Sequence, residues 1–185
     1  MNKTTSSDFL AKLSQVKLLA LDVDGVLTDG GLYYTENGEE LKRFNVKDGM
    51  GIKLVIAAGI EVAIITNSVS VSVLHRAKKL GIKNVFLGVE DKLLALRTLC
   101  EKLQIDMSQV AYVGDDVNDL AILKVIGCPI TVADAMPNNQ SCAIYVTAKN
   151  GGCGAVREVC ELLINVKLED RSEMETSTRL SFKTQ

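Results

Sequence analysis

The sequence predicts an α/β protein whose parallel sheet is doubly wound, with helices on both faces. Short apolar runs alternate along the chain with longer stretches of helical character, and this β-α-β order is typical of parallel sheets with right-handed crossovers. Polar or charged residues follow directly after several of these runs, at the position where open α/β sheets bind ligands. We expect one domain over residues 1–166. Residues 167–185 are charged, rich in Ser and Thr and poor in large apolar groups, so we expect a flexible C-terminal tail.

The expected elements follow in chain order from the apolar runs and the turn residues. The first strand is expected at residues 16–21. A β-hairpin with arms at 32–35 and 40–45 comes next, because Asn37-Gly38 between the arms is a strong hairpin turn signal. The remaining strands are expected at 62–65, 85–87, 110–113, 129–132 and 144–146. The helices are expected at 47–58, 70–80, 92–103, 118–125 and 155–166.

Composition excludes several classes of protein. The chain of 185 residues is 47% hydrophobic and is long enough to bury a good core. Its net charge is −2 and it shows no basic stripe, which argues against a nucleic-acid partner. The first residues are polar, and we expect neither a signal peptide nor a membrane span. Five scattered cysteines fit neither a disulfide framework nor a zinc site, so we expect a cytoplasmic protein without a membrane partner.

The most informative feature is a pair of carboxylates at the end of the first strand, Asp22 and Asp24, followed by Gly25. Two anions this close repel each other unless a cation lies beside them, and oxygen ligands of this kind suit Mg²⁺. Gly25 allows a sharp backbone turn directly after the pair. The alternative is a strand that ends in two acids by chance. The pair therefore predicts a magnesium site at the carboxyl edge of the sheet.

A second acidic cluster follows the run at 110–113 and reads Gly114-Asp115-Asp116-Val-Asn118-Asp119. Asp115 is expected to face the same metal from a neighbouring strand. The alternative is a helix capped by Asn118, which explains one residue and leaves Asp115 and Asp116 unexplained.

Two more strand ends carry groups that suit a phosphoryl oxygen. Thr66 and Asn67 follow the run at 62–65 and offer a hydroxyl and an amide. Lys92 opens the helix at 92–103 and brings a positive charge, although it could equally be an ordinary surface lysine. The sequence thus presents Asp-x-Asp, Thr, Lys and Gly-Asp-Asp-x-x-Asp in that order, each at a strand end.

This ordered set resembles the haloacid dehalogenase superfamily of phosphohydrolases. Longer matches are similar to one family within it, the 3-deoxy-D-manno-octulosonate 8-phosphate phosphatases; they lie at 21–30, 38–49, 114–119, 132–135 and 151–158. The resemblance implies a Rossmann-like core with an inserted hairpin. It also implies Mg²⁺-dependent hydrolysis of an acidic keto-sugar phosphate through an aspartyl-phosphate, as a step in lipopolysaccharide biosynthesis. The spacing between motifs leaves no room for a cap domain.

The resemblance also implies the residue roles. Asp22 would be the nucleophile and a metal ligand, and Asp115 a further metal ligand. Asp24 would be the general acid and base and would bind the metal through its backbone carbonyl. Thr66, Asn67 and Lys92 would hold the phosphoryl oxygens, and Asp119 would orient Lys92 or a metal-bound water.

One motif departs from the family pattern: Thr66-Asn67-Ser68 stands where octulosonate phosphatases commonly read Thr-Gly-Arg. Ser68, Arg76 and Lys79 are candidate substrate-binding residues, the last two by reaching a neighbour's site; the alternative is that both are solvated helix charges. Arg157 could be a substrate contact or a helix surface charge. A nonulosonate (sialic-acid-type) 9-phosphate is the alternative substrate, and a non-catalytic phosphoacceptor or assembly module is the alternative class.

The hairpin carries more apolar surface than a free hairpin should show: Leu32, Tyr33, Tyr34, Leu41 and Phe44. It could fold over its own sheet. The family resemblance implies instead a homotetramer in which hairpins associate and neighbouring subunits complete the sites.

Overall fold

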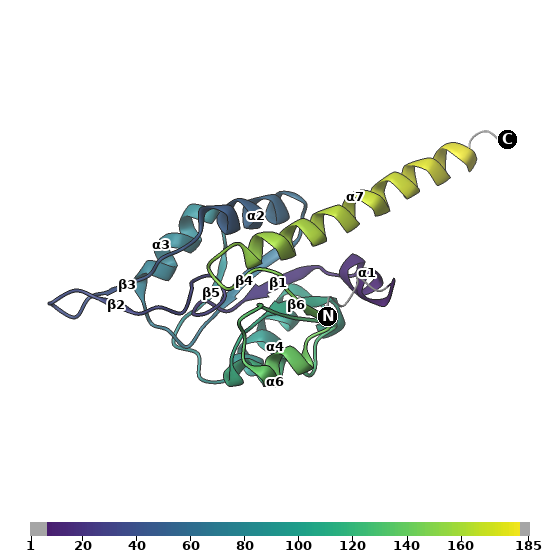
Figure 1. The fold of residues 1–185 in the computed structure, drawn as a ribbon. Helices are drawn as coiled ribbons and strands as arrows, with labels where there is room; N and C mark the ends of the chain where they lie inside the picture. Colours follow the sequence, from purple (N-terminus) through teal and green to yellow (C-terminus); the bar gives the residue numbers. More distant parts are fainter. Residues whose placement is uncertain (1–6, 182–185) are drawn as a thin grey trace.

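A parallel sheet forms the centre of the molecule (Figure 1). The computed structural model describes residues 7–181, with side chains described for residues 8–168. The strand order β5-β4-β1-β6-β7-β8 places the first strand in the middle, which confirms the doubly wound sheet. The bounds are Leu18–Leu21 for β1, Glu61–Ile65 for β4, Asn84–Phe86 for β5, Val110–Val113 for β6, Cys128–Thr131 for β7 and Tyr145–Val146 for β8.

Helices cover both faces of the sheet (Figure 1). One face packs against α1 (Ser7–Ser14), α2 (Val46–Ala57), α3 (Val71–Leu80) and α7 (Ala155–Ser181). The other face packs against α4 (Lys92–Leu103) and the short α5 (Leu120–Leu123), with α6 (Pro137–Cys142) beside α5. β1 is buried on both faces, since Leu19 and Leu21 enter the first core and Leu18 and Ala20 the second. This explains why its sequence reads as a continuous apolar run.

The register of the central strands decides where the functional side chains emerge. Leu21, the last residue of β1, pairs with Ile64 of β4 on one side and Val113 of β6 on the other. The parallel strands therefore end level with one another, and the residues that follow them share one edge of the sheet.

The predicted hairpin consists of β2 (Tyr33–Tyr34) and β3 (Glu40–Leu41), which pair antiparallel. Gly38 closes its turn at φ +81°, a conformation that favours glycine, and donates its N–H to the Thr35 carbonyl. The hairpin extends away from the sheet (Figure 1), and Leu32 and Tyr34 are 62% and 61% exposed. The alternative that the hairpin folds over its own sheet is therefore wrong.

Phe44 behaves differently from the rest of that apolar set. It packs against the main core, and the Arg76 guanidinium lies over its ring at 5.7 Å. Its assignment to the exposed hairpin surface is wrong, because the chain has already turned back toward α2 at this residue.

Helical structure extends beyond what the sequence patterns predicted. α1 and α6 were not expected, and the helix expected at 118–125 is a 3₁₀ turn, Val117–Asp119, followed by α5. α7 does not end at residue 166 but continues to Ser181, and its second half projects beyond the rest of the molecule (Figure 1).

The extension of α7 has a physical cause. Residues 167–181 hold no Gly or Pro and are rich in good helix formers, and the Lys167 ammonium is tied to the Ser14 carbonyl at 2.7 Å. The prediction of a tail rested on low apolar content, which reports on core burial rather than on helix propensity.

That 1–166 is one domain and that 167–185 is flexible stay predictions. No helix among the described residues is long and apolar enough to cross a membrane.

Candidate active site

Asp22 stands at the centre of the carboxyl edge of the sheet. Its N–H continues the β1–β6 ladder to the Val113 carbonyl at 3.0 Å, so its backbone is fixed by the sheet. Its Oδ1 accepts the Val23 N–H at 2.7 Å and its Oδ2 lies 2.7 Å from Lys92 Nζ. The side chain is almost fully buried. Each carboxylate oxygen thus has a defined partner, which leaves the side chain little rotational freedom.

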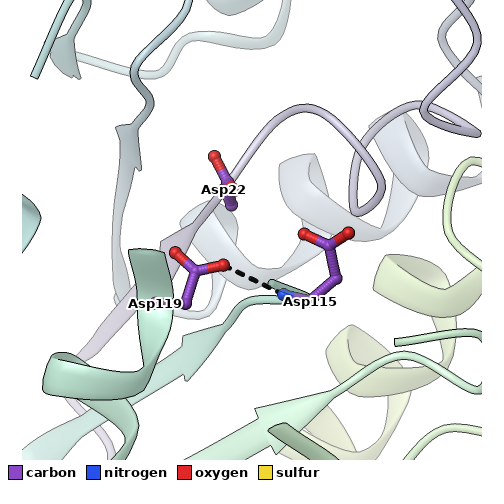
Figure 2. A group of neighbouring side chains, drawn as sticks. All are labelled: Asp22, Asp115 and Asp119. Atoms are coloured by element: carbon purple, nitrogen blue, oxygen red, sulfur yellow. Dashed lines mark hydrogen bonds between the residues drawn. The ribbon is translucent and has the colours of Figure 1, made fainter. Parts of the chain in front are cut away.

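Asp115 and Asp119 complete a cluster of three carboxylates with Asp22 (Figure 2). One oxygen from each residue lies within 4.8 Å of the others. Asp115 follows β6, as predicted. Next to this cluster Gly25 has φ +81°, and a Cβ there would overlap the Asp115 carboxylate, so a glycine is required for the two loops to pack.

Asp119 is fully committed to protein partners. Its Oδ1 accepts the Tyr112 hydroxyl at 2.6 Å and the Lys92 ammonium at 2.8 Å. Its Oδ2 accepts the backbone N–H of Asp115 at 3.0 Å (Figure 2) and that of Asp116 at 3.4 Å. A carboxylate with all these partners is suited to orienting its neighbours rather than to binding a ligand directly.

The electrostatics of the cluster are unfavourable without a cation. The pKa of Asp22 is raised to about 7, first by burial and then by the charge of Asp119, while Lys92 offsets this only in part. The pKa of Asp115 is also raised to about 7, again first by burial and then by the charges of Asp22 and Asp119. Among the described residues, the buried Asp115 Oδ1 has no hydrogen-bond partner.

These observations fit a hard divalent cation such as Mg²⁺. An unpartnered buried carboxylate oxygen, two raised carboxyl pKa values and a set of oxygen ligands are the features that such an ion would resolve. Asp22 and Asp115 are the side chains suited to hold it. The Asp24 side chain is not part of the group, which is consistent with a role for its backbone carbonyl.

Lys92 is a buried cation at the first position of α4, not a surface lysine. Burial lowers the pKa of its ammonium, but the charges of Asp22 and Asp119 outweigh burial and raise it. The group therefore stays positively charged beside the nucleophile candidate. Asp91 caps the helix by accepting the Leu94 N–H at 2.9 Å, which fixes the backbone that presents the lysine.

Thr66, Asn67 and Ser68 form the loop after β4. Thr66 is buried and its hydroxyl accepts the Ser68 N–H at 3.1 Å, while the Ser68 hydroxyl accepts the Ser70 N–H at 3.2 Å. The exposed Asn67 accepts a hydrogen bond from the Asn118 side chain at 2.9 Å. The loop thus lies against the 3₁₀ turn of the second acidic cluster.

The capping alternative for Asn118 is wrong. Asp116 is the residue that caps this turn, by accepting the Val117 N–H at 2.6 Å, and the Asn118 side chain points to the loop after β4 instead. Sequence reasoning missed this because Asn and Asp are equally good caps.

The Asp24 side chain is paired with a lysine rather than with the carboxylate cluster. Its Oδ1 is 2.5 Å from the ammonium of Lys42, which sits directly after β3. Sequence reasoning missed Lys42, and the sequence gives no signal that distinguishes it from an exposed hairpin lysine. It also missed Tyr112, whose hydroxyl position depends on the face of β6 that carries it.

A glycine-rich loop at 151–154 supports the turn that follows Asp22. Gly152 donates its N–H to the Val26 carbonyl at 3.0 Å, and a Cβ at Gly151 would overlap the backbone of Gly25. Asp134 accepts the Gly151 N–H at 3.0 Å, and the Asn45 amide donates to the Gly152 carbonyl at 3.1 Å. Residues from four of the matched sequence segments, 21–30, 38–49, 132–135 and 151–158, therefore meet around the turn after Asp22.

The structure does not bring Arg76, Lys79 or Arg157 into the carboxylate cluster. Arg76 donates to the Asn45 carbonyl at 2.8 Å and so ties α3 to the start of α2. Lys79 is exposed on α3, and the Arg157 guanidinium pairs with Glu161 one turn along α7. That Arg76 and Lys79 contact substrate in a neighbouring subunit's site stays a prediction.

Comparisons with known proteins show the family of this chain. A family model for haloacid dehalogenase-like hydrolases matches residues 81–159. The chain is 50% identical over 159 residues to a 3-deoxy-D-manno-octulosonate 8-phosphate phosphatase of Escherichia coli K12, covering 86% of this chain and 85% of that protein.

Solved structures give the same result. The crystal structure of the enzyme of that name from Yersinia pestis matches with a TM-score of 0.86 and 44% identity, covering 87% of each chain. The crystal structure of the Moraxella catarrhalis enzyme also matches, with a TM-score of 0.86 and 41% identity, over 91% of this chain and 97% of that one. That structure is a complex with magnesium ion, phosphate ion and a KDO molecule. The chain belongs to the 3-deoxy-D-manno-octulosonate 8-phosphate phosphatase family of haloacid dehalogenase-like hydrolases.

Proposed function

We propose that this protein is a Mg²⁺-dependent phosphatase that hydrolyses 3-deoxy-D-manno-octulosonate 8-phosphate through an aspartyl-phosphate on Asp22. The observation that carries the proposal is the buried Asp22–Lys92–Asp119 ion-pair network, with Asp115 beside it, at the open end of the central strands. Family membership over most of the chain supports the same substrate class, and the proposal places the enzyme in lipopolysaccharide biosynthesis.

In the first half-reaction, a carboxylate oxygen of Asp22 attacks phosphorus and the bond to the sugar oxygen breaks. Asp24 donates a proton to that leaving oxygen, so the sugar departs as a neutral alcohol. Lys92, only 2.7 Å from Asp22, is placed to contact the transferred phosphoryl oxygens, and the Thr66 hydroxyl and Asn67 amide would add further donors.

In the second half-reaction, water attacks the phosphorus of the aspartyl-phosphate and releases inorganic phosphate. Asp24, now ionised, accepts the proton from that water, which restores the starting protonation states. The network around Asp22 stays in place throughout, because Lys92 and Asp119 exchange no protons in either step.

Mg²⁺ would be held by the Asp22 and Asp115 carboxylates and the Asp24 backbone carbonyl. When bound, it supplies positive charge that offsets the negative charge gathering on the phosphoryl group. Asp119 would act indirectly, by fixing Lys92 and the backbone N–H of Asp115.

The proposal includes a homotetramer. The hairpin exposes Leu32, Tyr33, Tyr34 and Leu41, which are between 46% and 62% exposed and need a partner surface. It also includes a cytoplasmic location, since all five cysteines are free thiols, as is usual in a reducing compartment.

A panel of phosphate esters tests the proposal. Purified protein with Mg²⁺ should release phosphate from octulosonate 8-phosphate with a higher kcat/KM than from a nonulosonate 9-phosphate, and a metal chelator should stop both reactions until Mg²⁺ is restored. A preference for the nonulosonate would change the substrate. Phosphorylation of Asp22 without turnover would instead indicate a phosphoacceptor module.

A further inference from the structure

Lys42 is a second buried lysine at the site, and the proposed reaction leaves it without a role. Its ammonium lies 2.5 Å from Asp24 Oδ1 and 2.9 Å from Glu40 Oε1. The Lys42 side chain is 2% exposed, whereas that of Asp24 is 40% exposed. The lysine side chain is therefore covered by protein, whereas the acid is partly open to solvent.

Burying an ammonium group costs free energy unless it is paired, and here both partners are carboxylates. The Lys42 ammonium is paired with both of them, through a hydrogen bond to Asp24 and an ion pair with Glu40. The arrangement is a three-membered ion-pair network that joins the base of the hairpin to the turn after Asp22.

Glu40 is itself held by the hairpin. It pairs with Tyr34 across the two strands, and the Tyr34 hydroxyl donates to Glu40 Oε2 at 3.4 Å. Lys42 therefore cannot move independently of the hairpin, and its position sets the position of the Asp24 carboxylate.

The two oxygens of Asp24 are consequently not equivalent. Oδ1 is occupied by the Lys42 ammonium, a donor with no capacity to accept a proton from Asp24 while it stays charged. Oδ2 is the oxygen that remains for proton transfer.

We propose that Lys42 is a positioning residue for the acid–base step: it holds Asp24 by Oδ1 and so directs all proton transfer through Oδ2. This inference rests on the proposed function. In the first half-reaction the proton leaves Oδ2 for the sugar oxygen as the phosphorus–oxygen bond to the sugar breaks. In the second, Oδ2 takes a proton from the attacking water as the bond from phosphorus to Asp22 breaks. Lys42 keeps its protons throughout.

A comparison of two substrates separates this role from general support of the fold. kcat/KM reports the steps up to the release of the first alcohol, and a sugar alkoxide needs protonation to leave whereas p-nitrophenolate does not. In Lys42→Met, kcat/KM for octulosonate 8-phosphate should fall by roughly 10- to 100-fold. This loss is smaller than the full contribution of general acid catalysis, because Asp24 itself remains. For p-nitrophenyl phosphate, kcat/KM should fall by less than about threefold.

Four further variants give the experiment its scale. Asp24→Asn should show the same preference for the aryl substrate in a stronger form, because it removes the acid itself. Lys42→Arg keeps a cation at Oδ1 and should recover much of the loss. Glu40→Gln weakens the hold on Lys42 and should give a smaller loss with the same substrate dependence. Lys47→Met removes an exposed lysine of α2 and should change neither value.

The outcomes distinguish this inference from the proposed function. If the unmodified protein does not hydrolyse octulosonate 8-phosphate with Mg²⁺, the proposed function is wrong. If it does, but Lys42→Met and Glu40→Gln lose activity equally on both substrates, or lose none, the positioning role is wrong and the proposed function stands. Should Lys42→Met fail to fold, Glu40→Gln and Lys42→Arg give the same comparison, because each keeps a side chain of similar size.

Discussion

The carboxylate cluster and the hairpin both contact the turn after Asp22, and they differ in how they are supported. In the cluster, Asp22, Lys92 and Asp119 are at most 4% exposed, and their charged groups are held by one another and by backbone N–H groups. In the hairpin, each strand is only two residues long. The apolar side chains of the hairpin are about half exposed or more. An isolated two-stranded hairpin is marginally stable in water.

The difference teaches that, in the proposed mechanism, phosphoryl transfer and proton transfer depend on parts of the protein that are supported differently. The groups proposed for phosphoryl transfer lie after β1, β4 and β6 and at the start of α4, all within one chain. Proton transfer uses Asp24, whose partner Lys42 belongs to the hairpin. In the proposed homotetramer, substrate binding would depend on the hairpin as well. Four changes of graded effect test this contrast.

The largest effect is expected from Asp22→Asn, which removes the proposed nucleophile and one proposed metal ligand from the carboxylate cluster. kcat should fall by at least roughly 10³-fold on every substrate, since no other group can form the covalent intermediate. Circular dichroism should show an unchanged fold, because the amide has the shape of the carboxylate. Turnover near the parent rate, with contaminating phosphatase excluded, would end the assignment of Asp22.

A second, smaller effect is expected when the hairpin surface is made polar. The double variant Leu32→Asp, Leu41→Asp should shift the protein from tetramer to monomer in light scattering and raise KM for the sugar phosphate by about tenfold, because the partner that closes the cleft is lost. kcat for p-nitrophenyl phosphate should stay within about threefold of the parent, since the carboxylate cluster and Lys92 are unchanged.

The control for this variant is Val125→Asp, which changes an exposed apolar residue between α5 and β7. It should leave both the oligomeric state and KM unchanged. A parent protein that is monomeric and fully active in solution would contradict the link between hairpin, assembly and substrate binding.

A third change adds a cation to the loop after β4. Ser68→Arg should raise kcat/KM for octulosonate 8-phosphate by roughly three- to tenfold if position 68 contacts the sugar carboxylate, with no gain on p-nitrophenyl phosphate. Ser68→Ala is the matched control, because it also removes the hydrogen bond that Ser68 accepts from Ser70 without adding charge. Equal results for the two variants would show that position 68 does not select the substrate.

The smallest effect is on stability, and it depends on pH. The pKa values of Asp22 and Asp115 are raised to about 7 in the folded, metal-free protein and lie near 4 when it is unfolded. Between these values the folded state binds more protons, so the free energy of unfolding falls as pH rises from about 4 to about 7. The Tm of metal-free protein should therefore be a few degrees lower at pH 8 than at pH 5.

Mg²⁺ should reverse this trend, because it binds the ionised carboxylates. The rise in Tm on adding Mg²⁺ should be larger at pH 8 than at pH 5, and Asp115→Asn should reduce it strongly. A metal-free Tm that rises over this range, or a Mg²⁺ effect independent of pH, would contradict the assignment of these two carboxyls.

Much of the fold could be predicted from the sequence, because many helix and strand ends are set by the residues next to them. The strand Val110–Val113 and the helix Lys92–Leu103 were predicted with their observed ends, because an apolar run or an amphipathic stretch meets a clear polar boundary there. The extent of α7 could not be predicted in the same way. Low apolar content was taken to mean a tail, whereas residues 167–181 have the propensity to form a helix without a core to cover.

The sequence by itself determined that Asp22, Thr66 and Asp115 come just after strands of the sheet, and parallel strands end at one edge. Only the tertiary structure decided how those groups are held. Tyr112 on Asp119, Lys42 on Asp24 and Arg76 on the Asn45 carbonyl are contacts between residues 7, 18 and 31 positions apart. Such contacts depend on which face of a strand a side chain occupies and where the hairpin turns back. The physical reason is that local sequence sets the backbone and its polar ends, whereas side-chain pairing depends on packing between segments that the sequence does not place relative to one another.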